Sequence, residues 1–319
     1  MRRYIILAIL ILVMSSLSSA HAQKKARLSI ATGGTGGVYY PLGGAIASVL
    51  SKYVPTIEAT AEVTAASVDN CKLIGAKKVE LALTMTDAVQ DAFQGVGMFK
   101  EKIPLRTICA IFPNSMHIVT VQGKGINEVL DLKGKRVSTG APGSATEVQG
   151  LRILEAYGID PNKDLKREKL GASESAGALK DRKIDAYFWS GGYPTSSVTD
   201  LASTPGFKIK LLAHGEAIPK MSDKYGKIYS QGIIPARTYP GQESDVPVAW
   251  GWALLVCHEK MEEKMVYDII KTLFDRKFEL VAIHREAQHL NLDRQVNESP
   301  IPFHSGAARY YMEKGLKLK

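Results

Sequence analysis

Two glycine-rich turns are the parts of the sequence best suited to hold a small ligand. The first covers residues 33–37, Gly-Gly-Thr-Gly-Gly, between a predicted strand and a predicted helix. Glycine lets a ligand approach the backbone closely, and the first amide groups of a helix are unpaired and carry partial positive charge. The turn can therefore bind an anion without a basic side chain, and an ordinary tight turn is the alternative interpretation. It is not a dinucleotide fingerprint, because Tyr39 stands where the last glycine would fall.

The second turn, residues 139–144, leads into a segment with a helix-capping pattern. Ser144 and Glu147 are spaced as in a capping box, which predicts Ser144 as the N-cap of a helix. Contact between Ser144 and a ligand is compatible with that role, because both occur at the same helix start. A third turn begins at Trp189 after a predicted strand, and its aromatic and glycine residues suit the wall of a small-molecule pocket. A core residue followed by a turn is the alternative for Trp189.

Patterns for covalent or metal chemistry do not occur in the sequence. There is no Gly-x-Ser-x-Gly nucleophile elbow and no His-Glu-x-x-His, and His284 and His289 are five apart, whereas a helical metal pair requires four. We therefore expect no enzymatic activity, no metal and no cofactor. Cys71, Cys109 and Cys257 lie among apolar residues, which favours buried free thiols and leaves one disulfide open.

The elements that position these turns alternate between predicted strands and helices, which indicates an α/β fold. Residues 27–30 have the pattern of a strand, and the apolar stripe from Leu42 to Tyr53 recurs at helical spacing. A weak internal repeat is also visible. Arg-Leu-Ser from residue 27 and Arg-Val-Ser from residue 136 each precede a glycine-rich turn, a helix and, at similar distances, another strand. Two α/β units whose glycine turns face each other across a cleft are predicted, with chance similarity as the alternative.

The N-terminus has the pattern of a secretory signal peptide. Two arginines precede an apolar run over residues 4–14, and an Ala-x-Ala cleavage pattern ends at Ala22. A signal peptide of residues 1–22 and a mature chain that begins at Gln23 are therefore predicted, with an uncleaved anchor as the alternative. Export to the periplasm is expected.

The composition agrees with an exported, soluble protein. The chain of 319 residues is 45% hydrophobic and 23% charged, which is typical of a globular protein of about two domains. Its formal net charge is +9, and a basic protein outside the cytoplasm seldom meets nucleic acid. The charge therefore favours an anionic solute or a membrane surface, and no nucleic-acid partner is expected.

The series of motifs along the chain resembles the TAXI group of solute receptors, which serve tripartite ATP-independent periplasmic (TRAP) transporters. The matching segments are residues 32–44, 64–70, 131–137, 140–146, 192–195, 234–241 and 302–307. They cover essentially the whole mature chain in order. The chain departs from the pattern of the group at Ala65, Ala66 and Ala145, where glycine is usual, at Met85, where glutamine is frequent, and at Trp189, which is bulkier than usual. These departures imply a smaller or more apolar pocket.

The resemblance implies an α/β fold of the two-lobed, type II-like periplasmic binding protein class, with the ligand cleft between the lobes. Lobe I would comprise residues 23–114, lobe II residues 115–240, and residues 241–319 would return to lobe I with the C-terminal helices. A small organic acid, such as glutamate or another carboxylate, would be bound and delivered to TRAP-type permease subunits. The implied contacts are Gly36, Gly37, Tyr39, Thr64, Ser67, Gly143, Ser144, Thr146 and Tyr193, to which the third turn adds Trp189.

Two alternatives to this function remain at the level of the sequence. A receptor that feeds another transporter or a sensor kinase would have the same general construction. An exported hydrolase with Ser144 as its nucleophile is the other, although neither a nucleophile elbow nor partner motifs accompany that serine.

Overall fold

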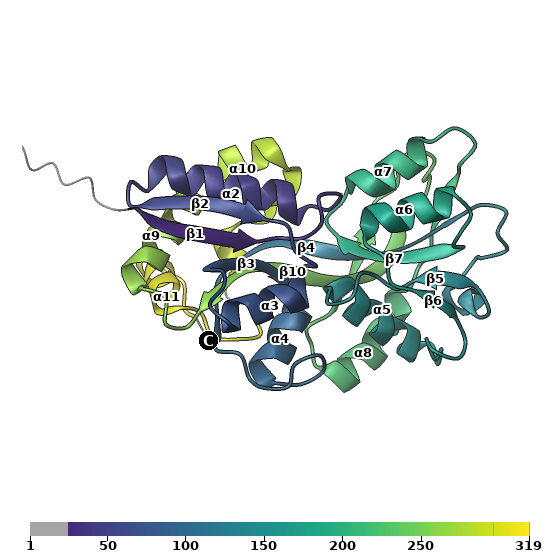
Figure 1. Ribbon diagram of the computed structural model, residues 1–319, viewed down its shortest axis with the longest axis horizontal. Coiled ribbons are helices and arrows are strands. Elements are labelled where there is room, and N and C mark those ends of the chain that lie inside the picture. Colours follow the sequence, from purple (N-terminus) through teal and green to yellow (C-terminus); the bar gives the residue numbers. More distant parts are fainter. Residues whose placement is uncertain (1–24, 296, 319) are drawn as a thin grey trace, which may run out of the picture.

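The computed structural model describes residues 25–295 and 297–318 as two α/β lobes joined by long central strands (Figure 1). The predicted signal peptide of residues 1–22 lies outside the described residues. None of the described helices combines the length and the apolar character that a bilayer span requires.

A single mixed sheet runs through both lobes. Among the described residues, its spatial order is β2-β1-β3-β10-β4-β7-β5-β6, with β8 beside β4 and β9 beside β10. The strands are β1 (Ala26–Ala31), β2 (Ile57–Glu62), β3 (Leu81–Met85), β4 (Leu105–Val121), β5 (Arg136–Ser138), β6 (Lys166–Glu168), β7 (Ala186–Gly191), β8 (Ile209–Leu211), β9 (Ser230–Ile234) and β10 (Val246–His258).

Helices cover both faces of this sheet in each lobe (Figure 1). The α-helices are α2 (Tyr39–Tyr53), α3 (Ser67–Gly75), α4 (Thr86–Gln94), α5 (Ala145–Ala156), α6 (Ala172–Lys180), α7 (Ser196–Ser203), α8 (Ile218–Tyr225), α9 (Glu263–Asp275), α10 (Lys277–Ile283) and α11 (Ser305–Glu313). Short 3₁₀ helices are η1 (Val129–Leu132), η2 (Gly215–Ala217), η3 (Arg285–His289) and η4 (Leu292–Arg294).

Lobe I consists of β1, β2 and β3 with α2, α3, α4 and the C-terminal helices, and lobe II of β5 to β9 with α5 to α8. The apolar stripe predicted for the first helix is confirmed, because Leu42, Ile46 and Leu50 of α2 are fully buried against lobe I. All five residues of β3 are buried, as is usual for parallel strands covered on both faces. The three cysteines are buried and free, as expected.

The two lobes share one strand topology. In lobe I, β1 lies between β2 and β3, and all three are parallel. In lobe II, β5 lies between β6 and β7, again with parallel pairing. Each central strand leads through a glycine turn into a helix, α2 or α5. The internal repeat predicted from the sequence is therefore confirmed.

Two long antiparallel strands connect the lobes. They are β4, with 17 residues, and β10, with 13 residues, and they pair with each other. One end of β10 pairs with β3 in lobe I and the other with β9, whereas β4 pairs with β7 and β8 in lobe II. The division of the chain at residues 114 and 240 stays a prediction.

Candidate functional site

The two lobes enclose a cavity of about 320 Å³. It lies where the parallel strands of both lobes end and the following loops begin, which is the edge at which open α/β sheets bind ligands. Most of its lining comes from residues 33–39, 63–67, 144–146, 170–174 and 189–191. The two glycine turns therefore face each other across a cavity, as the repeat predicts.

Eight of the ten residues predicted to contact a ligand line this cavity. They are Gly36, Gly37, Tyr39, Thr64, Ser67, Ser144, Thr146 and Trp189. Gly143 and Tyr193 are not among the lining residues. The chain leaves the cavity after Gly191, and the Tyr193 carbonyl accepts a hydrogen bond from Arg285 Nε at 3.0 Å. Tyr193 thus faces the C-terminal segment, and its position in the third turn gave no sign of this.

Gly143 joins the two lobes beside the cavity. Its carbonyl accepts hydrogen bonds from the amides of Val68, at 3.1 Å, and Asp69, at 3.2 Å, in the first turn of α3. Its φ of 79° lies in the left-handed region that favours glycine. The role of Gly143 in the structure is therefore a contact between lobes.

Four of the helices in the described part of the chain begin at the cavity, two from each lobe. Their first residues are Tyr39 of α2, Ser67 of α3, Ala145 of α5 and Ala172 of α6, and all four line it. The first amides of a helix lack intrahelical partners and form the positive end of its dipole. Among the described residues, no lysine or arginine lines the cavity, and Glu174 is the one charged residue that does. Backbone amides and hydroxyl groups are thus the available donors for an anion.

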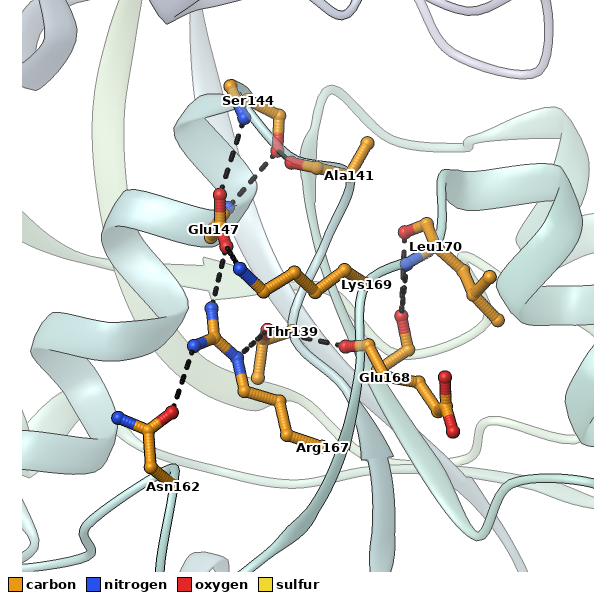
Figure 2. Close-up of polar contacts among 11 residues, drawn as sticks. Thr139, Ala141, Ser144, Glu147, Asn162, Arg167, Glu168, Lys169 and Leu170 are labelled. Atoms are coloured by element: carbon orange, nitrogen blue, oxygen red, sulfur yellow. Dashed lines mark hydrogen bonds and ion pairs between the residues drawn. The ribbon is translucent and has the colours of Figure 1, made fainter. Parts of the chain in front are cut away.

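Behind the lobe II wall, a buried carboxylate holds the turn that precedes α5 (Figure 2). Glu147 Oε1 accepts hydrogen bonds from Arg167 Nη2 at 2.6 Å and lies 3.2 Å from Lys169 Nζ. Its Oε2 accepts from the Gly143 amide at 3.3 Å. The Glu147 side chain is only 2% exposed, so these partners compensate a charge that water does not reach.

Ser144 is the N-cap of α5, as predicted. Its hydroxyl accepts a hydrogen bond from the Glu147 amide at 3.2 Å and donates to the Ala141 carbonyl at 2.7 Å (Figure 2). The reciprocal half of the capping box differs from the prediction, because the Glu147 carboxylate binds the amide of Gly143 and not that of Ser144. The Ser144 amide donates instead to the Ala141 carbonyl at 3.1 Å.

Trp189 forms a fixed wall of the cavity. Its Nε1 donates to Thr195 Oγ1 at 3.0 Å, and Thr195 Oγ1 donates to the Gly192 carbonyl at 2.6 Å. The far edge of the indole lies against Gly37 of the other lobe, where an added Cβ would lie 2.9 Å from the Trp189 Cη2 atom. The lack of a side chain at Gly37 therefore lets the two lobes approach.

Two polar side chains on neighbouring strands lie at the floor of the cavity, and sequence reasoning missed both. Asn114 of β4 and Ser190 of β7 are buried, and Asn114 Oδ1 and Ser190 Oγ have no hydrogen-bond partner among the described residues. Asn114 Nδ2 donates to the Tyr39 hydroxyl at 3.1 Å, and burial raises the pKa of that hydroxyl. For Asn114, the available signal was the polar pair Asn114-Ser115 within the mostly apolar stretch 105–121.

A protein-family model, described as the NMT1-like family, matches residues 30–315. This chain belongs to the NMT1-like family. The membership covers both lobes, the two glycine turns and the connecting strands of this NMT1-like protein.

Solved structures with a similar fold are distant in sequence. An ancestral arginine-binding protein bound to arginine is 15% identical, with 82% of this chain and 97% of that chain covered and a TM-score of 0.51. A putative L-cystine ABC transporter from Listeria monocytogenes is 16% identical, with 84% and 98% covered and a TM-score of 0.50. The alkanesulfonate-binding protein SsuA from Xanthomonas axonopodis pv. citri, bound to MOPS, is 15% identical, with 84% and 85% covered and a TM-score of 0.50. The predicted fold, a two-lobed α/β periplasmic binding protein of type II, is confirmed.

The predicted membership of the TAXI group is wrong, because the family model that matches is that of the NMT1-like family. The motifs behind that prediction are mainly glycine turns and helix starts after parallel strands. Such features are required wherever a strand must turn sharply into a helix beside a ligand, so they indicate the fold more strongly than one group within it.

Proposed function

We propose that this NMT1-like protein is an extracytoplasmic solute-binding protein that takes up a small organic anion between its lobes and delivers it to a membrane importer. Two of the similar structures are named for binding a solute, arginine in one and alkanesulfonates in the other. The third is named as part of an ABC transporter, which favours an ABC-type importer as the partner. The predicted signal peptide of residues 1–22 supports a periplasmic location.

The observation that carries this proposal is the convergence of four helix starts from both lobes on one cavity. An oxyanion head group, carboxylate or sulfonate, would accept hydrogen bonds from the amides near Gly36 and Thr146 and from the Ser190 hydroxyl, which has no partner among the described residues. Gly37 and Thr64 would lie beside the head group, because the Gly37 amide already donates to the Gly34 carbonyl and the Thr64 hydroxyl to Asn70 Oδ1. Each hydrogen bond to a charged group contributes ~1.5–3 kcal/mol. Several of them, less the cost of ordering, are enough for micromolar affinity, about −8 kcal/mol.

The rest of the proposed ligand is compact and largely apolar. Tyr39, Met85 and Trp189 line the cavity together, and their side chains offer apolar surface to the body of a ligand. Ser67 and Ser144 complete the set of predicted contacts that line the cavity. Closure follows from binding, because only the closed arrangement brings donors from both lobes to the same anion.

A thermal-shift panel tests the proposal on the mature protein. The panel contains short mono- and dicarboxylates, alkanesulfonates, amino acids and neutral sugars, and calorimetry follows for each compound that raises the melting temperature. Stabilisation by carboxylates or sulfonates is expected, and the comparison between them identifies the head group. Stabilisation by neutral sugars alone would refute the proposal.

A further inference from the structure

A buried ion pair connects the lobes at a place that the cavity does not reach. Arg152 of α5, in lobe II, donates from Nη2 to Asp91 Oδ2 of α4, in lobe I, at 2.6 Å. The two side chains are only 9% and 7% exposed. Neither residue lines the cavity. The pair therefore ties helix to helix across the gap between the lobes.

Tyr229 extends this connection to a second carboxylate of lobe I. Its hydroxyl accepts a hydrogen bond from Arg152 Nη1 at 2.9 Å and donates to Asp87 Oδ2 at 3.0 Å. Asp87 also accepts from the Ala88 amide at 2.7 Å. Burial raises the pKa of the Asp87 carboxyl, and the positive charge of Arg152 opposes that rise. One guanidinium of lobe II is thus connected to two carboxyl groups of lobe I, directly to that of Asp91 and through Tyr229 to that of Asp87.

The guanidinium of Arg152 is held in place from its other side. It stacks on the Tyr225 ring, with 4.0 Å between the guanidinium carbon and the ring centre, and the Tyr225 hydroxyl donates to Glu155. The Tyr225 carbonyl accepts a further interlobe hydrogen bond from Gln90 Nε2 of α4 at 3.0 Å. Lobe II therefore presents Arg152 in one orientation, and α4 supplies the matching carboxylates.

We propose that Asp87, Asp91, Arg152 and Tyr229 form a latch that holds the two lobes in the closed arrangement and so raises ligand affinity without touching the ligand. The charges are compensated only while α4 and α5 are in contact. Removal of one partner leaves a buried charge uncompensated, and that charge is better hydrated when the lobes part. The link to affinity rests on the proposed function, whereas the link to lobe opening does not.

Hydrogen exchange at another contact between the lobes measures opening without a ligand. The amides of Val68 and Asp69 donate across the lobes to the Gly143 carbonyl, so their exchange reports on separation. In the mature protein, Arg152→Met is expected to speed exchange in peptides containing these amides by about tenfold or more. Tyr229→Phe keeps every charge and removes only the bridging hydroxyl, and about a fivefold increase is expected.

A matched control separates the latch from a general loss of stability. Arg309 pairs with Glu263 at 3.1 Å within lobe I, and both side chains are about half exposed. Arg309→Met is expected to leave exchange at Val68 and Asp69 unchanged. Unchanged exchange in Tyr229→Phe and in any folded Arg152→Met protein, with lowered stability only, would overturn the latch.

Binding of the anion that most stabilises the wild-type protein gives a second measurement. Both latch variants are expected to bind it more weakly, with a faster dissociation rate, because the closed form is less populated. If exchange is accelerated in the variants but the wild-type protein binds no compound of the thermal-shift panel, the proposed function is refuted and the role of the latch in lobe closure is supported. Accelerated exchange with unchanged affinity would refute the link between latch and binding.

Discussion

Two of the regions over which the lobes meet have opposite chemistry. Around the cavity, the contacts are backbone and hydroxyl hydrogen bonds, such as those from Val68 and Asp69 to Gly143 and from Ser196 Oγ to the Gly36 carbonyl at 3.0 Å. Between α4 and α5, the contacts are buried charges. An ion pair inside the cavity would compete with an anionic ligand for the same donors. The difference suggests that recognition and closure are carried by separate groups.

A loss of charge behind the cavity should have the largest effect. Glu147→Gln leaves Arg167 beside a neutral amide in a buried site, and the free energy of unfolding is expected to fall by about 3–5 kcal/mol. Urea unfolding followed by circular dichroism measures this. The control is Glu263→Gln, whose partner Arg309 is half exposed, with an expected loss below about 1 kcal/mol. Equal losses in the free energy of unfolding would show that the buried ion pair of Glu147 contributes no more to stability than an exposed one.

The pH dependence of stability should reveal a third contact between lobes, where Glu286 of η3 packs on Gly192. Burial raises the pKa of Glu286 to about 7, opposed by Arg285, and Glu286 Oε2 lies 3.7 Å from His289 Nε2. Between an ordinary carboxyl pKa of about 4.3 and 7, the folded protein holds a proton that the unfolded chain has lost. The free energy of unfolding from this group therefore falls as the pH rises through that window, by up to about 3 kcal/mol.

Replacement of the Glu286 carboxyl tests the direction of this pH dependence of stability. Glu286→Gln should remove the decline and unfold at a higher urea concentration than wild type at pH 8, whereas the two should differ little at pH 4. Glu101→Gln, at an exposed position, should leave the profile unchanged. A Glu286→Gln protein that is less stable than wild type at pH 8 would show that the carboxylate is compensated.

Gly37→Ala should hinder closure of the lobes at the cavity, where the contacts between the lobes are uncharged. The added Cβ would lie 2.9 and 3.0 Å from two carbons of Trp189, and the indole is held through Nε1. Affinity for the selected anion is expected to fall about tenfold, or about 1.4 kcal/mol, in calorimetry. Gly34→Ala is the matched control from the same turn, because nothing lies within 4 Å of its added Cβ. If both variants bind like wild type, contact between Gly37 and Trp189 does not limit closure.

Two lobe II serines that line the cavity should give the smallest effects, one on stability and the other on affinity. Ser144→Ala removes a helix cap, so stability is expected to fall by about 1 kcal/mol with little change in affinity. Ser190→Ala removes a buried hydroxyl that has no partner among the described residues, so stability should hardly change. Its affinity for the anion should fall about fivefold if that hydroxyl contacts the ligand. The same pattern in both variants would remove Ser190 from the proposed site.

Local features of this fold were predictable from the sequence because local geometry determines them. The helical spacing from Leu42 to Tyr53, the N-cap at Ser144 and the two glycine turns each depend on residues a few positions apart. The internal repeat then indicated two like units, and the turns of two such units meet when the units face each other. The individual contacts came from the resemblance to the TAXI group, with Trp189 added from the third turn, and eight of those ten residues line the cavity.

What only the tertiary structure decided is which distant groups meet across the lobes. Asp91 and Arg152 are 61 residues apart, and Asp87 and Tyr229 are 142 apart, so no periodicity relates them. Asn114 and Ser190 likewise come from distant parts of the chain and meet at the cavity floor. Gly143 and Tyr193, in contrast, contact partners outside the cavity, which their positions in the turns did not indicate. Spacing along the chain sets the face of a helix or strand on which a side chain lies. The partner that it meets there depends on how the two lobes pack, which is a property of the whole fold.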